Sequence, residues 1–323
     1  MTAPPAQTQY YHHGRFRVAG GVLPDAITAY RTYGDPGNPC IIFPTSYSAK
    51  LDGQARRVGE NKALNPKKYF IVTFATFCNG EPSPYNGPYF PAISYEDNIL
   101  GVKKIFMAFG FSMGGQQAYH WAVVFPDFVE RYVVICGSAK TSIHNKAFLE
   151  GPKAALLASK DFEDGHYKTN PERGIRAFAR VWSAWAYGQS FFRGKEFEEG
   201  GAYPNLESFF KEKWEQNFLG AWDANDMLAL LETWYTGDIS IVRHGGNLGA
   251  CLADIKARGL ILPCQTDLYF PPEDSIMEGG HLKERGRIAV IPSTWGHMAG
   301  TGANPEADAF IQGEVMRFME EPL

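Results

Sequence analysis

The chain has 323 residues, of which 45% are hydrophobic and 20% are charged, and its formal net charge is −4. This composition suits one large globular domain, or a domain with an insertion, and excludes a disordered tail or a small disulfide-stapled scaffold. The weak negative charge and the lack of a long lysine or arginine run argue against nucleic acid and anionic membranes as partners.

Cysteine usage and the chain ends bear on the compartment. The five cysteines form no CxxC pair and have no histidine at metal-ligand spacing, so neither a disulfide framework nor a metal site is predicted. The first residues lack the apolar segment of a signal peptide, and no run reaches the roughly 18 apolar residues that a membrane span needs. The ending EPL is not a peroxisomal signal. We therefore expect a soluble, cytoplasmic protein.

Short apolar runs bounded by Gly, Pro and Asn recur along the chain and predict β-strands. These runs are residues 27–34, 40–46, 69–76, 104–110, 131–138, 259–267 and 287–294. Most are apolar on both faces, as is typical of strands covered by helices on two sides. Helical patterns at 113–125 and 304–320, the second opened by an asparagine cap and a proline, alternate with them. This alternation predicts an α/β fold with a mostly parallel, doubly wound sheet.

Residues 147–245 interrupt this alternation. They are rich in Trp, Phe and Tyr at helical spacing and contain no clear strand. We therefore predict an α/β core formed by residues 1–146 and 246–323, with a helical lid formed by residues 147–245. Such an insertion between two late strands would lie over the carboxyl edge of the sheet, where ligands bind in open α/β folds. Most of its aromatic residues are expected to form the core of the lid.

The connection between the strands at 69–76 and 104–110 is unusual. A parallel crossover needs a helix of about a dozen residues. The sequence offers mostly loop, CNGEPSPYNGPYFPAIS, and leaves only YEDNILGV at 95–102 for a helix. We expect a shortened helix before residue 101.

The segment AFGFSMGG at 108–115 contains a GxSxG motif centred on Ser112. A lone match can be merely a glycine-rich join between a strand and a helix. Here the motif follows an apolar strand and opens an amphipathic helix, the setting in which a tight turn exposes a nucleophilic serine. We predict that Ser112 is the nucleophile and that the backbone amide of Met113, at the helix N-terminus, stabilises an oxyanion.

Serine needs a base and an orienting carboxylate to act as a nucleophile. Asp267 ends one late apolar run and His297 follows another, in the order Ser, Asp, His. Both lie just past strand ends on the edge expected for Ser112. A second oxyanion donor is expected from the loop after residue 43, at the amide of Ser46 or Tyr47.

Other histidines and aspartates fit worse. His120 is expected to be in contact with the helix or solvent, while His144 and His244 flank the insertion. For the remaining candidates, we expect His12 and His13 in an N-terminal tail, His281 after a Gly-Gly turn, Asp274 as a helix cap, and Asp238 in the insertion.

With these residues identified, the whole chain resembles the homoserine O-acetyltransferase family of α/β-hydrolases, especially its fungal-type branch. The matching stretches are GVLPDAITAYRTYGD, NPKKYFIVTFATFCNGEPSPYN, FGFSMGGQQAYHWAVVFPDFVERYVVI, FLGAWDANDMLAL, TDLYFPPED and WGHMAG. The resemblance implies an α/β-hydrolase fold and a reaction in which Ser112 takes an acyl group from an ester or thioester. The acceptor would be an alcohol or water.

The resemblance also implies candidate substrate-binding residues. An arginine and a tyrosine seven residues later hold the homoserine carboxylate in the family, and Arg180 and Tyr187 have that spacing. An ion pair within the insertion is the alternative for Arg180. The family has an aspartate directly after the catalytic histidine to meet the substrate ammonium. This chain has Met298, which cannot pair with a cation.

Three functions remain open on this basis. The first is an esterase or acyltransferase for a small ester or thioester, and the second is homoserine O-acetylation for methionine synthesis. The third is a non-catalytic binder on the same fold. No cofactor or metal is predicted, with acetyl-CoA as a conceivable acyl donor, and the assembly could be a homodimer. The branch resembled also suggests a role in secondary metabolism.

Overall fold

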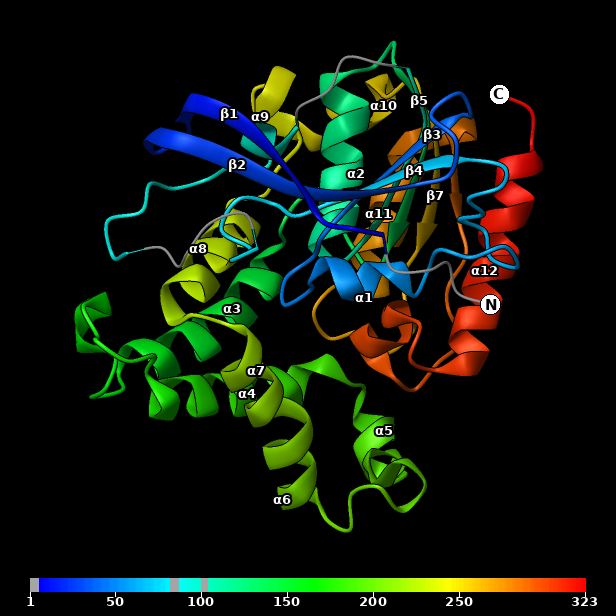
Figure 1. Cartoon of the computed structure of the whole chain (residues 1–323). Helices are drawn as coiled ribbons and strands as arrows, with labels where there is room; N and C mark the ends of the chain where they lie inside the picture. The colour runs from blue at the N-terminus through cyan, green and yellow to red at the C-terminus, as the bar shows by residue number, and fades with distance from the viewer. Residues whose placement is uncertain (1–5, 82–86, 100–103) are drawn as a thin grey trace.

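The computed structural model describes residues 6–81, 87–99 and 104–323. Eight strands form one sheet in the order β1-β2-β4-β3-β5-β6-β7-β8 (Figure 1). The strands are β1 (Gln9–Val18), β2 (Gly21–Tyr33), β3 (Cys40–Pro44), β4 (Phe70–Phe74), β5 (Ile105–Phe111), β6 (Val129–Ile135), β7 (Arg258–Leu262) and β8 (Gly286–Ile288). β2 pairs antiparallel with β1 and β4, and the other strand pairs are parallel. The predicted α/β fold is confirmed.

Twelve α-helices accompany the sheet in the described part of the chain. They are α1 (Leu51–Ala55), α2 (Met113–Val124), α3 (Ile143–Leu157), α4 (Glu172–Ala186), α5 (Gln189–Arg193), α6 (Leu206–Ser208), α7 (Gln216–Ala221), α8 (Ala224–Tyr235), α9 (Ser240–Arg243), α10 (Leu248–Asp254), α11 (Pro272–Leu282) and α12 (Pro305–Glu320). A π-helical turn at Phe209–Glu215 joins α6 to α7. Within the described residues, no helix is both long and apolar enough to span a membrane.

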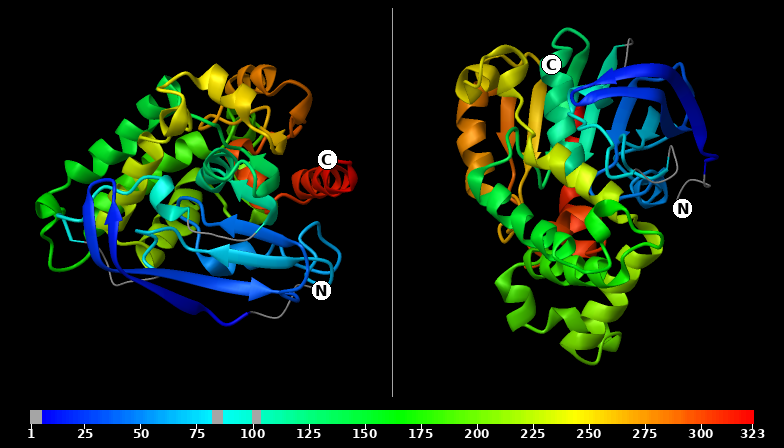
Figure 2. Two further views of the ribbon diagram at one scale, coloured as in Figure 1. Left: turned by 90° about the horizontal axis from the view of Figure 1, so that it is seen from above. Right: turned by 90° about the vertical axis from the view of Figure 1, so that its left-hand side faces the viewer.

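Alternating side chains of the central strands build a core on each face of the sheet. On β3, Ile41 and Phe43 belong to the cluster that includes the apolar side of α12. Ile42, between them, belongs to the opposite cluster, together with residues of α2 and α10. The views in Figure 2 show helices on both sides of the twisted sheet. The two covered faces explain why these strands carry mostly apolar side chains on both faces.

The N-terminal segment corrects one expectation. His12 and His13 lie in β1, which pairs with β2 at the edge of the sheet, and not in an irregular tail. β1 is exposed at most of its positions, so it contains no apolar run by which a buried strand could be recognised. An edge strand of this kind is defined by its partner more than by its own composition.

The crossover between β4 and β5 contains little helix. In its described residues, 75–81, 87–99 and 104, the helical element is the 3₁₀ turn Glu96–Asn98. Residues 100–102, the rest of the expected short helix, lie outside the described residues. Ile93, Tyr95 and Ile99 are nevertheless buried, so apolar side chains of this loop take part in the core where helix is lacking.

Between β6 and β7, the regular secondary structure is helical apart from one isolated bridge between Lys140 and Asp238. We call α3 to α8, residues 143–235, the helical cap. Figure 1 and the right-hand view of Figure 2 show the cap gathered at one end of the sheet. The first cap helix, α3, begins at Ile143, four residues before the lid boundary expected at residue 147. After the cap, α10 contributes Cys251 and Leu252 to the core beside α2.

Candidate active site

Ser112 lies on a sharp turn between β5 and α2. Its φ of 56° and ψ of −125° put a non-glycine residue in a region that L-amino acids rarely adopt. Strain of this kind costs on the order of 1–3 kcal/mol and persists where surrounding structure enforces it. Here the amide of Ser112 donates to the carbonyl of Ile135 on β6, at 2.8 Å, which fixes the turn to the neighbouring strand.

The glycines of the motif allow β5 and α2 to approach each other. A Cβ atom on Gly110 would lie 1.9 Å from the carbonyl oxygen of Gly114, which no side chain could tolerate. A Cβ atom on Gly114 would lie 3.0 Å from the carbonyl oxygen of Pro44 on β3. The glycine spacing therefore follows from the close packing that holds Ser112 at the carboxyl edge of the sheet.

Ser112, His297 and Asp267 are joined by hydrogen bonds. His297 Nε2 lies 2.9 Å from Ser112 Oγ, and His297 Nδ1 lies 2.8 Å from Asp267 Oδ2. The other carboxylate oxygen, Oδ1, accepts hydrogen bonds from the amides of Tyr269 and Phe270 at 2.8 and 3.0 Å. All three site residues are buried. The structure thus brings together the three residues that the sequence selected, with the carboxylate held on both of its oxygens.

The histidine is also fixed by its surroundings. It lies on the 3₁₀ turn Gly296–Thr301, where Gly296 has a positive φ of 55°. Its ring contacts Phe111 and Tyr269, with centroids 4.8 and 4.7 Å away. A Cβ atom on Gly296 would lie 2.7 Å from the amide nitrogen of Gly188, so glycine is required there on two counts.

The competing residues lie elsewhere. His120 is buried, with Nδ1 2.8 Å from the Gln116 carbonyl, and His144 Nε2 lies 3.0 Å from the Leu268 carbonyl. Two expectations were wrong. His281 belongs to the last turn of α11, since Gly279 and Gly280 are helical, and Asp274 lies inside the first turn of α11 without capping it.

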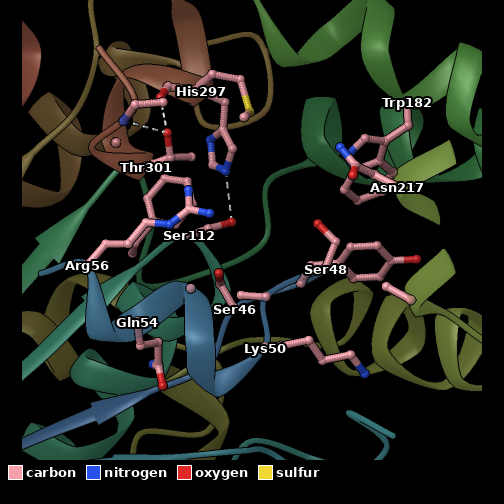
Figure 3. A pocket seen from close by; sticks show the side chains of 18 of the residues that line it. Ser46, Ser48, Lys50, Gln54, Arg56, Ser112, Trp182, Asn217, His297 and Thr301 are labelled. Atoms are coloured by element: carbon pink, nitrogen blue, oxygen red, sulfur yellow. Dashed lines mark hydrogen bonds between the residues drawn. The ribbon is translucent and has the colours of Figure 1, made fainter. Parts of the chain in front are cut away.

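A cavity of about 510 Å³ opens beside Ser112 and His297 between the core and the helical cap. Trp182, Trp222 and Tyr269 supply aromatic walls, and the hydroxyl of Tyr269 donates to the Trp182 carbonyl at 2.6 Å. Figure 3 shows Trp182 facing the side of the cavity that holds Ser112 and His297. Sequence reasoning missed these cavity residues as individuals, although Tyr269 could have been found from its place two residues after Asp267.

The expected oxyanion donors lie at this cavity. Ser46 and Tyr47, in the loop after β3, line it with Ser112, and Met113 is the first residue of α2. The first amides of a helix have no intrahelical acceptor. Hydrogen bonds found in the described part of the chain also leave the amides of Ser46 and Tyr47 without an acceptor. Tyr47 is anchored by its ring, which stacks on Trp182 at 4.4 Å.

Arg180 and Tyr187 are not among the residues that line the cavity, whereas Met298 is. Arg180 makes a two-pronged ion pair with Glu207, at 2.7 and 2.9 Å, and its Nε donates to Glu215 at 2.5 Å. This is the ion pair considered as the alternative role for Arg180. Tyr187 is buried and stacks on Phe191 at 3.9 Å. The spacing of seven residues was therefore not sufficient to bring either side chain to the cavity.

One group of metal-type ligand atoms lies close together in the described residues. It consists of Cys136, Asp267 and His297, whose ligand atoms are within 4.8 Å of one another. Both carboxylate oxygens of Asp267 and both ring nitrogens of His297 already take part in hydrogen bonds. Burial raises the pKa of the Cys136 thiol, which keeps it protonated and a poor ligand. We assign no metal or cofactor to this group.

A strained serine after a strand, a histidine and a buried carboxylate at later strand ends define an enzyme of the α/β-hydrolase class. Comparison with known proteins identifies the family. A probable esterase of Corynebacterium glutamicum is 31% identical over 86% of both chains. Ethyl acetate hydrolase of Pseudomonas veronii is 29% identical over 94% of this chain and 92% of its own. The chain belongs to this family of α/β-hydrolase esterases. Its relatives also include homoserine O-acetyltransferases. One from Chloroherpeton thalassium is 29% identical over 79% of this chain and 75% of its own.

The solved structures agree with this assignment. An acetylester hydrolase from Corynebacterium glutamicum superimposes with a TM-score of 0.92 and 27% identity, over 98% of this chain and 96% of its own. No protein-family model matches the sequence. The chain is therefore an α/β-hydrolase enzyme of the kind that hydrolyses esters or transfers acyl groups by serine chemistry, as the sequence predicted. The relatives include both esterases and acetyltransferases, so the relatives alone do not tell whether water or an alcohol accepts the acyl group. The residues that line the cavity bear on this choice.

Proposed function

We propose that the protein is a serine esterase that hydrolyses small esters of short-chain acids through an acyl group carried on Ser112. One observation carries this proposal: the continuous hydrogen-bonded series from Ser112 through His297 to Asp267, at distances of 2.9 and 2.8 Å, beside an open cavity. The names of two relatives, an ethyl acetate hydrolase and an acetylester hydrolase, support acetyl as the acyl group.

In the first half of the reaction, Ser112 Oγ attacks the ester carbonyl carbon while His297 Nε2 accepts the serine proton. Asp267 stabilises the imidazolium that forms. The negative oxygen of the tetrahedral intermediate would accept hydrogen bonds from the amide of Met113 and from that of Ser46 or Tyr47. The C–O bond to the alcohol then breaks, and His297 donates its proton to the departing alcohol.

In the second half, water attacks the acyl carbonyl carbon and gives a proton to His297 Nε2. The bond from this carbon to Ser112 Oγ breaks, the serine recovers its proton from His297, and the acid leaves. The two halves use the same three side chains. No group beyond the ester and water is consumed.

Water is the acceptor that the cavity favours over homoserine. The ammonium of homoserine would find no carboxylate among the described residues that line the cavity, and Met298 stands where the family has an aspartate. A buried ammonium without a partner costs several kcal/mol. Arg180, whose guanidinium is bound to Glu207 and Glu215, is likewise not available for the carboxylate of homoserine.

The test compares Ser112→Ala with Ser190→Ala, which changes an exposed serine on α5 away from the cavity. We expect Ser112→Ala to lower kcat for p-nitrophenyl acetate by at least about 10⁴-fold and to abolish labelling by a fluorophosphonate, while Ser190→Ala keeps both. Intact-protein mass spectrometry should detect the acetylated enzyme, and added alcohols or homoserine should not speed its decay. Turnover retained in folded Ser112→Ala would contradict the proposal.

The remaining sequence-based expectations stay predictions. They are the fungal-type branch, a role in secondary metabolism, a cytoplasmic location, a homodimer, acetyl-CoA as a donor, and the division into an α/β core and a lid. A non-catalytic binder stays the alternative to any enzyme function at Ser112. Absence of fluorophosphonate labelling in folded protein would favour it.

A further inference from the structure

The cavity beside Ser112 carries an unusual set of charges. Four basic side chains line it, and no Asp or Glu is found among the described lining residues. The basic residues are Lys50, Arg56, Arg57 and Lys213. The wall of the cavity is therefore cationic, although a neutral ester of a simple alcohol would need no positive charge for binding.

Three of these four cations are held by partners within the protein. Arg57 pairs with Asp308 at 3.1 Å and donates to the Gly300 carbonyl. Lys213 pairs with Glu199. Lys50 donates to the Asn79 carbonyl and lies 3.8 Å above the ring of Trp222. The positive charges of these three side chains are thus largely compensated within the protein.

Arg56 differs from the other three. It directly follows α1, its side chain is exposed, and its guanidinium has no hydrogen-bond or ion-pair partner in the part of the chain that the structure describes. Asp52, one helical turn earlier, is instead paired with Arg31 at 2.6 Å. Figure 3 shows the Arg56 side chain extending from α1 across the cavity toward Ser112 and His297.

We propose that Arg56 binds an anionic group, a carboxylate or a phosphate, carried by the ester substrate whose carbonyl reacts with Ser112. This inference rests on the proposed esterase function and narrows its substrate to acidic esters. The planar guanidinium presents paired N–H donors that match the two oxygens of a carboxylate or phosphate. With the guanidinium free of protein partners, binding such a group breaks no existing ion pair.

The surroundings of Arg56 fit this preference. Arg57, Lys50 and Lys213 lie in the same wall with their charges largely compensated by the protein, and no carboxylate on the described wall opposes an incoming anion. Arg56 is exposed, so solvent and salt will weaken the interaction. The expected preference is accordingly about tenfold, near the lower end for hydrogen bonds to charged groups.

The experiment uses matched acetyl esters that differ only in charge. Acetoxyacetate, 3-acetoxypropanoate and 4-acetoxybutanoate are each compared with the corresponding primary amide, and acetate release gives kcat/KM. In the wild-type protein, we expect the ratio of kcat/KM for carboxylate over amide to exceed one at the best-fitting length, and to fall with added salt. Arg56→Gln should lower this ratio about tenfold, and Arg56→Lys should lower it less. Arg17→Gln removes an exposed charge on β1 and should keep the wild-type ratio.

A second pair separates the two sources of anion. Acetyl-CoA and S-acetylpantetheine carry the same thioester, but the first alone carries the nucleotide phosphates. Phosphate would be identified as the anion if acetyl-CoA were preferred over S-acetylpantetheine, if this preference depended on Arg56, and if no carboxylate ester were preferred over its amide. A ratio at or below one in every pair, or one that Arg56→Gln leaves within twofold, would overturn the proposal. If the protein hydrolysed neither the charged acetyl esters nor the neutral acetyl esters that carry the amide group, the esterase function itself would be refuted.

Discussion

The core and the helical cap hold their polar side chains in different ways. In the core, Ser112, Asp267 and His297 lie in the segments that follow three different strands, β5, β7 and β8, and meet within hydrogen-bonding distance. In the cap, Arg180 makes its ion pairs with Glu207 and Glu215, which belong to the cap itself. The core thus presents its polar groups to a cavity, whereas these charged groups of the cap serve the cap's own packing.

Backbone geometry explains this difference. Parallel strands all end at one edge of the sheet, so a polar residue just after a strand is directed to a known place. A helix has no such common edge, because the direction of each side chain depends on how the helix is rotated and tilted against its neighbours. Position along the chain is therefore informative about function in the core and much less so in the cap.

The first way to test this comparison is Asp267→Asn, which should have the largest effect. The Asn side-chain oxygen can still accept from the amides of Tyr269 and Phe270, and this would direct its NH₂ group at His297 Nδ1. His297 would then carry its proton on Nε2 and could not accept one from Ser112. We expect kcat for an acetyl ester to fall about 10³- to 10⁴-fold with little change in Tm.

The matched control is Asp274→Asn, which changes a carboxylate in the first turn of α11 outside the cavity lining. It should keep kcat within about twofold of the wild-type value. If Asp267→Asn retained a tenth of the wild-type kcat, the role assigned to this carboxylate would be wrong. Esterase assays on both folded variants decide the matter.

Much of the core could be predicted from sequence. Seven strands were found because buried strands are apolar on both faces, and Ser112, Asp267 and His297 were found because they lie in the segments that follow the predicted strands. β1 was missed because an edge strand exposed at most positions has no apolar run. Some boundaries differ by several residues: the run 287–294 was assigned to a strand, whereas β8 is Gly286–Ile288. Apolar composition identifies buried chain, but hydrogen bonding to a neighbour decides where a strand stops.

The charged residues around the cavity were much harder to predict. Arg56 and Lys213 come from segments about 160 residues apart in sequence, and both reach one cavity only because the cap is folded against the core. One partner of Arg180 is Glu215, which lies in a π-helical turn. A π-helical turn shifts the angular position of every residue after it, so helical periodicity cannot predict which side chains meet.

The second test concerns Glu278 on α11, a buried carboxyl of the core. Its Oε1 accepts from the amide of Ala139 at 2.8 Å, and burial raises its pKa to about 8. In the unfolded chain this carboxyl ionises near its ordinary pKa. Between these two values the unfolded state loses a proton that the folded state keeps, so raising the pH lowers stability, by up to about 1.4 kcal/mol per pH unit.

We therefore expect Glu278→Gln to gain stability relative to the wild type as pH rises from about 5 to 7.5, since glutamine can still accept from Ala139 and has no charge to bury. Denaturant unfolding at several pH values measures the difference. Glu273→Gln, which changes an exposed carboxyl of the same helix, should keep the wild-type pH slope. An unchanged slope in Glu278→Gln would mean that Glu278 is charged in the folded protein.

The smallest effect is expected in the cap, from Arg180→Met. Arg180 is partly exposed, whereas Glu215 is buried and would keep its ion pair with Arg176, at 2.9 Å. Because Glu215 retains one partner, we expect the free energy of unfolding to fall by about 1–2 kcal/mol, with kcat/KM for an acetyl ester within about threefold of wild type. Arg193→Met, at an exposed arginine of α5, should change neither quantity. Denaturant unfolding and ester kinetics on both variants separate a structural role of Arg180 in the cap from a role in substrate binding. Unchanged stability with a raised KM would show that Arg180 binds substrate, and the contrast between core and cap would then be wrong.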